Sequence, residues 1–235
     1  MPFRVTRSPI LDIKADAAVI AVENPMVPAL GACSEALAQA GGEALREALR
    51  QKRFLPVGSA VVVEPGALPY RQVLATCTPR WWNGECNELL VLQRCYESIF
   101  SLAETLGCRS LALPFLSAAN YGFPRESAVR IARSLSEESE LDLCFAAETE
   151  ELWQLATQPR RRPRILSYVG YYRDYAVFRL EDGLFAFVDL REENRKVELR
   201  LCVEPFYFSG YDPAQPPLPP AELQRLREIY ESSVL

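Results

Sequence analysis

The sequence contains no histidine, and this absence narrows the chemistry that the protein can perform. It excludes nucleophilic catalysis of the Ser-His-Asp and Cys-His types, metals held by imidazole and acid–base chemistry by histidine. Any catalysis must therefore use carboxylates, amides, hydroxyls, backbone N–H groups or bound water.

Long apolar segments are also missing, since no run approaches the roughly 18 residues that span a bilayer. The N-terminal stretch MPFRVTRSPILDI lacks the charged-then-apolar layout of a signal peptide. We therefore expect no membrane association and a cytoplasmic location. A formal net charge of −5 makes nucleic acid an improbable partner, because broad nucleic-acid binding needs a basic surface.

Paired cysteines are the third absence. The seven cysteines include no C-x-x-C pair, and most of them lie in apolar runs, as small buried hydrophobic residues do. The sequence thus predicts no structural zinc, and we expect neither a metal nor a cofactor. These cysteines are Cys33, Cys77, Cys86, Cys95, Cys108, Cys144 and Cys202.

Residues 1–158 alternate between short apolar runs and segments with helical spacing, which predicts a three-layer α/β/α domain with a mixed sheet. Helices are expected over 34–52 with a break at Gly41-Gly42, over 87–107 with Asn87 at its start and Gly107 at its end, and after Pro124. Strands are expected over 3–7, 17–22, 59–64, 72–77, 110–115 and 141–147.

The composition changes at TQPRRRPR (157–164), and residues 159–235 are predicted to form a small β-rich module. Three or four strands are expected between 165 and 208, with a hairpin turn at EDG (181–183). A stiff proline-rich linker (212–220) then leads to a terminal helix over 221–233.

The stretch LALPFLSAANYGFPRESA (111–128) runs from a buried strand through a loop of small residues into a helix. Backbone N–H groups at such a helix start can cradle an anion, so the loop is a candidate phosphate site. The alternative is a strand-to-helix turn whose small residues serve packing only.

A second polar position lies in AVIAVENPMVPALGACSEALAQAGG (18–42), where a buried strand ends at Glu23-Asn24 and a loop with Gly31 precedes a helix. Ligands bind at the carboxyl ends of strands in doubly wound sheets, so this pair is a candidate for recognition. Alternatively, Asn24-Pro25 only starts a turn.

Four ordered segments together resemble the macro domain family, a module that binds ADP-ribose. ADAAVIAVENP resembles V-D-A-I-V-N-A-A-N-P, and ALAQAGG resembles A-I-H-R-A-A-G. GSAVVVEPGALPYRQVLATCTPRW resembles G-E-A-V-I-T-x-G-x-L-P-x-x-x-V-I-H-T-V-G-P-x-W. LALPFLSAANYGFPRESAVRIA resembles I-A-F-P-x-I-S-T-G-x-Y-G-F-P-x-x-x-A-A-x-I-A, and the match spans roughly residues 3–155.

This resemblance implies binding of ADP-ribose or a related nucleotide diphosphate at the strand ends. Asn24, or Glu23 in its place, is expected to face the distal ribose, and Ser34 stands where the family has an aspartate. Pro9 stands in place of the family's adenine-binding aspartate, with Asp12 or Asp16 as substitutes. The implied ligand-binding loops comprise Gly31 and Ala32 in the first, and Ser117, Ala118, Ala119, Asn120, Tyr121 and Gly122 in the second.

Some family members hydrolyse ADP-ribosyl esters, and the resemblance makes Glu23 the candidate that orients the attacking water. A different class of function stays open as well. The first loop has kept a single glycine, Gly31, which favours a non-catalytic interaction protein. In that case, residues 159–235 would bind a protein partner or form a homodimer.

Overall fold

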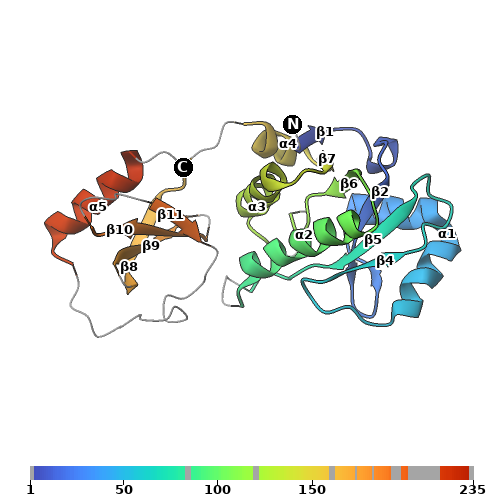
Figure 1. The fold of residues 1–235 in the computed structure, drawn as a ribbon, viewed down its shortest axis with the longest axis horizontal. Coiled ribbons are helices and arrows are strands. Elements are labelled where there is room, and N and C mark those ends of the chain that lie inside the picture. Colours follow the sequence, from blue (N-terminus) through green and yellow to red (C-terminus); the bar gives the residue numbers. More distant parts are fainter. Residues whose placement is uncertain are drawn as a thin grey trace. The chain divides into compact units, whose positions relative to one another are not determined.

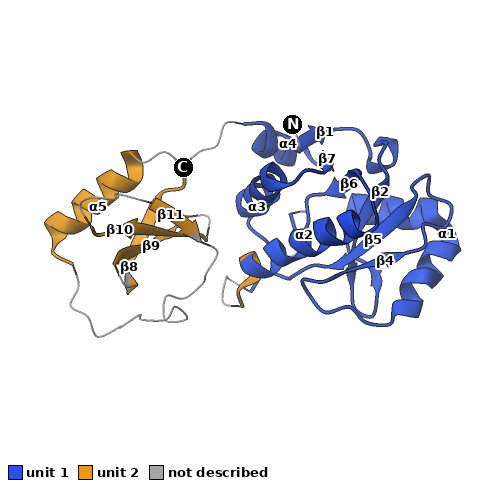
Figure 2. Cartoon of the chain, viewed as in Figure 1, with its two compact units in different colours: residues 1–82, 90–158 blue, residues 83–89, 159–235 orange. Residues whose placement is uncertain are grey.

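The computed structural model describes residues 3–82, 86–118, 122–158, 162–172, 174–181, 183–191, 197–200 and 218–232. The chain divides into two compact units (Figure 2). One unit comprises residues 1–82 and 90–158, and the other comprises residues 83–89 and 159–235.

The first unit contains a seven-stranded mixed sheet (Figure 1) with the strand order β1-β7-β6-β2-β5-β4 and β3 paired with β2. Neighbouring strands from β1 to β5 in this order are parallel, whereas β4 and β3 are antiparallel to their partners. All six predicted strands are confirmed, and β3 was not predicted. The strands are β1 (Phe3–Thr6), β2 (Ala17–Glu23), β3 (Val27–Pro28), β4 (Ala60–Val63), β5 (Gln72–Cys77), β6 (Ser110–Pro114) and β7 (Asp142–Ala146).

Helices cover both faces of this sheet, which confirms the three-layer prediction. Side chains alternate between the two faces of a strand, and β7 illustrates the result. Cys144 and Ala146 belong to the core cluster beneath α1 (Ala32–Lys52). Phe145 points to the other face, where its ring lies 6.2 Å from that of Tyr96 on α2 (Glu88–Thr105).

The predicted break in the first helix is present, since Gly42 has φ 69° and ψ −160° inside α1. Gly107 ends α2 as predicted, because it has φ 67° and its N–H donates to Glu104 O at 2.9 Å. The helix after Pro124 is α3 (Arg125–Glu138). The short η1 (Ile10–Asp12) and α4 (Glu150–Thr157) were not predicted.

The second unit has a four-stranded antiparallel sheet with the order β11-β10-β9-β8. The predicted hairpin at 181–183 joins β9 to β10, although Asp182 lies outside the described residues. Residues 212–217 of the linker predicted over 212–220 and the strand residues 201–208 also lie outside them. The elements are β8 (Ile165–Tyr172), β9 (Tyr175–Leu180), β10 (Phe185–Asp189), β11 (Val197–Arg200) and α5 (Pro220–Ser232).

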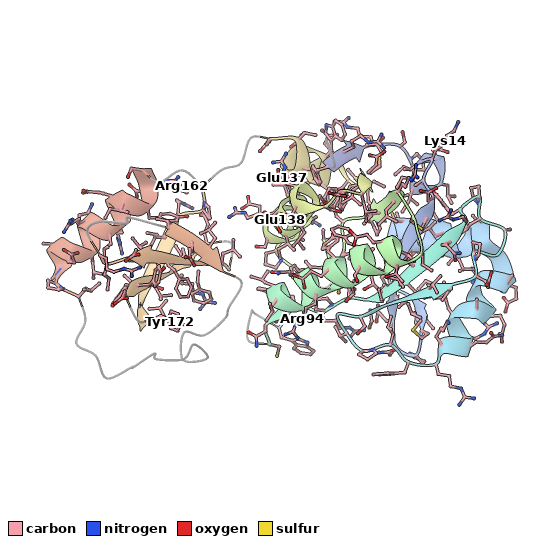
Figure 3. All side chains as sticks on the ribbon, in the orientation of Figure 1. Lys14, Arg94, Glu137, Glu138, Arg162 and Tyr172 are labelled. Atoms are coloured by element: carbon pink, nitrogen blue, oxygen red, sulfur yellow. The ribbon has the colours of Figure 1, made fainter. Side chains whose placement is uncertain are left out.

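The terminal helix α5 is fixed to the segment that precedes β8. Tyr230 is buried, and its hydroxyl donates to Pro163 O at 2.6 Å. The guanidinium of Arg162, labelled in Figure 3, lies over the Tyr230 ring, 5.4 Å from its centroid, which is close enough for a cation–π interaction. The helix predicted from the sequence is thereby confirmed as part of this unit.

Candidate functional site

The carboxyl ends of β2, β5 and β6 meet at one edge of the first unit's sheet because these strands are parallel. A small hollow, partly open to solvent, lies between this edge and the start of α1. Its polar lining consists of Ser34, Thr78, Ser117 and Glu148, and the remaining lining residues are Ala21, Ala29, Leu30, Gly31, Pro114, Phe115 and Leu116.

Glu23, the predicted catalytic residue, is the last residue of β2. Its side chain is 21% exposed, and Arg80 Nη2 lies 2.5 Å from Glu23 Oε2. Arg80 follows β5, the strand paired with β2. The guanidinium of Arg80 thus lies against the Glu23 carboxylate and offsets the negative charge of that carboxylate at the strand ends.

Asn24 uses both ends of its amide to hold the segment after α1. Its Nδ2 donates to Leu55 O at 2.9 Å, and its Oδ1 accepts from Leu55 N at 2.9 Å. Leu55 is thereby held in the core cluster beneath α1. An Asn24 contact with a ribose would require these two hydrogen bonds to break or be shared.

The first loop meets the hollow at Gly31, whose φ of 143° lies in the region that favours glycine. Ala32 is the exposed first residue of α1 and is not among the lining residues, whereas Ser34 is buried and lines the hollow. The backbone N–H of Cys33 donates to Glu148 Oε1 at 2.6 Å. Burial and the adjacent Glu148 carboxylate raise the pKa of the Cys33 thiol, so this thiol stays protonated.

The second loop begins at Ser117, which has a φ of 61° that is unusual for a residue with a β-carbon. The Ser117 hydroxyl donates to Pro79 O at 3.2 Å. Ala118 is buried, and its carbonyl accepts from Arg125 Nε at 3.2 Å. Gly122 has φ 67°, whereas the predicted site residues Ala119, Asn120 and Tyr121 lie outside the described residues.

Further contacts hold this loop in place. The buried Tyr96 hydroxyl of α2 accepts from the backbone N–H of Leu116 at 3.0 Å. The Trp81 ring packs edge-on against Phe123, with 5.1 Å between the ring centroids. The loop is therefore anchored before and after its small residues, which is the arrangement that a preorganised binding loop needs.

Asp16, considered as a substitute adenine-binding carboxylate, lies at the wrong edge of the sheet. It precedes β2 and accepts from the backbone N–H groups of Arg109 and Ser110 at 2.7 and 3.1 Å, at the start of β6. The strand ends that form the hollow are at the opposite edge. Its role is to join the beginnings of two neighbouring strands.

Three residues of the site were not predicted from the sequence: Arg80, Tyr96 and Glu148. Glu148 follows the buried strand β7, so the reasoning that singled out Glu23 at the end of β2 applies to it equally. Arg80, which follows β5, carries the same signal, whereas Tyr96 lies within α2 and carries none.

Among the described residues, no group of three or more cysteine or carboxylate side chains is arranged to hold a metal ion. None of the helices described here combines the length and apolar character needed to cross a membrane.

An α/β/α sandwich with a hollow at the carboxyl edge of a mixed sheet is an architecture in which ligands bind at the strand ends. The chain belongs to the macro domain family. The sequence profile described as "Macro domain" matches residues 23–132. An O-acetyl-ADP-ribose deacetylase of Citrobacter rodentium is 35% identical over 155 residues, which cover 60% of this chain and 88% of the relative.

Solved structures agree with this assignment. A Trypanosoma brucei macrodomain in complex with ADP-ribose has a TM-score of 0.56 and 30% identity, and the match covers 65% of this chain and 66% of that one. An Oceanobacillus iheyensis macrodomain with MES bound has a TM-score of 0.58 and 21% identity, covering 65% and 85% of the two chains. The second comparison shows the shared fold.

Proposed function

We propose that this protein binds ADP-ribose, or a related nucleotide diphosphate, in the hollow at the carboxyl ends of β2, β5 and β6. The observation that carries the proposal is the position of the hollow between the start of α1 and the anchored loop that begins at Ser117. The similar macrodomain of T. brucei was solved with ADP-ribose, which supports this choice of ligand.

Within this proposal, the loop from Ser117 to Gly122 takes a phosphate and the distal ribose. The Arg80–Glu23 pair supports placing the distal ribose near the end of β2, because the pair offers both a donor and an acceptor for hydroxyl groups. Gly31 allows the backbone to come close to the ligand from the other side.

Isothermal titration with ADP-ribose tests the proposal, and no heat change at millimolar ligand would reject it. Leu30→Glu and Val27→Glu make a matched pair, since both replace exposed apolar side chains and only Leu30 lines the hollow. We expect Leu30→Glu to weaken binding by about tenfold or more, because a carboxylate beside a diphosphate is repulsive. Val27→Glu should leave the affinity nearly unchanged.

A hydrolytic activity is a second proposal, favoured by the deacetylase name of the C. rodentium relative and by the Glu23 carboxylate at the strand end. Glu23 would orient a water that attacks the ester carbonyl of an ADP-ribosyl ester, releasing the acid and the ribose hydroxyl. Glu23→Gln should then abolish hydrolysis of O-acetyl-ADP-ribose while Glu35→Gln does not. Unchanged turnover in Glu23→Gln would reject the assignment.

The alternative to a ligand-binding role is association with another protein through residues 159–235. In this proposal, these residues form a separate domain. The favouring observation is Leu166, which is 60% exposed on β8, an edge strand of the second sheet. Light scattering of the full chain should show a dimer that Leu166→Lys converts to a monomer. A monomeric wild-type protein would reject self-association.

We also propose a cytoplasmic location. The six cysteines that the structure describes are all free thiols, the state that a reducing compartment maintains.

A further inference from the structure

We propose that Glu148 is a specificity-determining residue of the hollow. Its carboxylate repels anionic groups from the end of the hollow that α1 forms, and it accepts hydrogen bonds there from neutral donor groups of the ligand. The inference deepens the proposed function, since it concerns which part of a nucleotide lies where in the same hollow.

The backbone holds Glu148 in a fixed position. On one side, the N–H of Ala147 donates to Thr6 O at 2.9 Å, which continues the pairing of β7 with β1. On the other side, the hydroxyl of Thr149 accepts from Leu152 N at 3.2 Å and caps α4. Glu148 is the single residue between a sheet contact and a helix cap, so its Cα has little freedom to move away from the hollow.

The side chain is fixed as well. Glu148 Oε1 accepts from the backbone N–H of Cys33 at 2.6 Å in the first turn of α1. The residue before that turn, Gly31, has no side chain to cap the helix, so Glu148 supplies the negative charge that the helix dipole favours there. The N–H group that could otherwise bind a phosphate is already used by a protein carboxylate.

The charge of the hollow follows from its lining. Glu148 is the ionisable side chain among the lining residues, which are otherwise serine, threonine, glycine and apolar residues. Among the ion pairs between described residues, the neighbouring Glu150 and Glu151 have arginine partners, whereas Glu148 has none. A diphosphate placed at this end would meet a negative charge that has no cationic side chain beside it, whereas a hydroxyl or amino group would find an acceptor.

The test compares Glu148→Gln with the control Glu35→Gln. Glutamine keeps an oxygen that can accept from Cys33 N–H and removes only the charge. Glu35 lies in the same first turn of α1, is exposed and does not line the hollow, so its variant removes an equal charge outside the site. Glu148→Met, of similar length and uncharged, is the second variant should the glutamine variant fail to fold.

Inorganic pyrophosphate and ADP-ribose are titrated separately into the full-length protein. We expect Glu148→Gln to bind pyrophosphate about tenfold more tightly than both the wild type and Glu35→Gln. ADP-ribose should gain much less, because the glutamine oxygen still accepts from the neutral donors of the ligand. A pyrophosphate gain in Glu148→Gln no larger than that in Glu35→Gln overturns the inference.

The two probes separate the inference from the proposed function. Tighter pyrophosphate binding without any ADP-ribose binding would support the role of Glu148 and reject ADP-ribose as the ligand. Equal ADP-ribose affinities in all variants, with no pyrophosphate gain, would support ADP-ribose binding and reject the role of Glu148.

Discussion

Replacing Asn24 by alanine tests whether this side chain supports the fold or binds the ligand. The substitution removes the two hydrogen bonds that hold the backbone of Leu55, at 2.9 Å each. A hydrogen bond of this kind contributes about 1 kcal/mol net, so Asn24→Ala should lower the free energy of unfolding by about 2 kcal/mol. If Leu55, which is 7% exposed, also leaves the core, up to about 2 kcal/mol more is lost.

Thermal unfolding followed by circular dichroism measures this loss. For a domain of this size, a loss of about 2 kcal/mol lowers Tm by roughly 4–8 °C. Asn24→Asp provides a second arm, since an aspartate accepts from Leu55 N–H but cannot donate to Leu55 O. Its destabilisation should also reach about 1–3 kcal/mol, because the carbonyl is left without its donor and faces a carboxylate oxygen.

Isothermal titration with ADP-ribose on the same variants completes the comparison. The structural role predicts that binding weakens only as far as the fold does. An unchanged Tm in Asn24→Ala together with complete loss of ADP-ribose binding would refute the structural reasoning. It would show instead that the amide serves the ligand, as the resemblance implies.

Three other outcomes follow from single contacts. Tyr96→Phe leaves the buried N–H of Leu116 without its acceptor, which should cost about 1–3 kcal/mol and speed hydrogen exchange at that amide; unchanged exchange would contradict it. Gly66→Ala should destabilise strongly in urea titrations, because a β-carbon at this residue with φ 61° would lie 2.2 Å from Gly41 O; a wild-type midpoint would refute the clash. Hydrogen bonds from the backbone of residues 109 and 110 lower the pKa of Asp16. The ionised Asp16 carboxylate therefore stabilises the folded protein above its ordinary pKa, and this stabilisation is lost as the pH falls through the lowered value. Asp16→Asn should flatten the acid limb of the stability–pH curve, and an unchanged limb would reject this contribution.

The sequence was sufficient to predict the strands and helices of the first unit because their signals are local. A buried run such as residues 17–22 predicts a strand, and parallel strands carry the residues that follow them to one edge. A candidate site could therefore be proposed at the ends of β2 and β6. The short α4 was missed, although Thr149, with two glutamates after it, is a typical helix start.

The partners of the site residues could not be predicted in the same way. Asn24 is bound by Leu55, 31 positions later, and Glu23 pairs with Arg80, 57 positions later. Nothing within either local stretch specifies these contacts. They arise because β5 lies beside β2 and because the end of α1 returns to the carboxyl edge of the sheet.

The two carboxylates at this edge show why position alone does not determine a residue's role. Glu23 and Glu148 each follow or end a buried strand, yet Glu23 meets a guanidinium and Glu148 meets a backbone N–H. The first arrangement offsets the negative charge and leaves a donor–acceptor pair beside the ligand. The second leaves the charge facing the hollow, held there by the dipole of α1. One edge of the sheet therefore offers a donor–acceptor pair at Arg80 and Glu23 and a carboxylate acceptor at Glu148, and the difference lies in the partner that the fold provides.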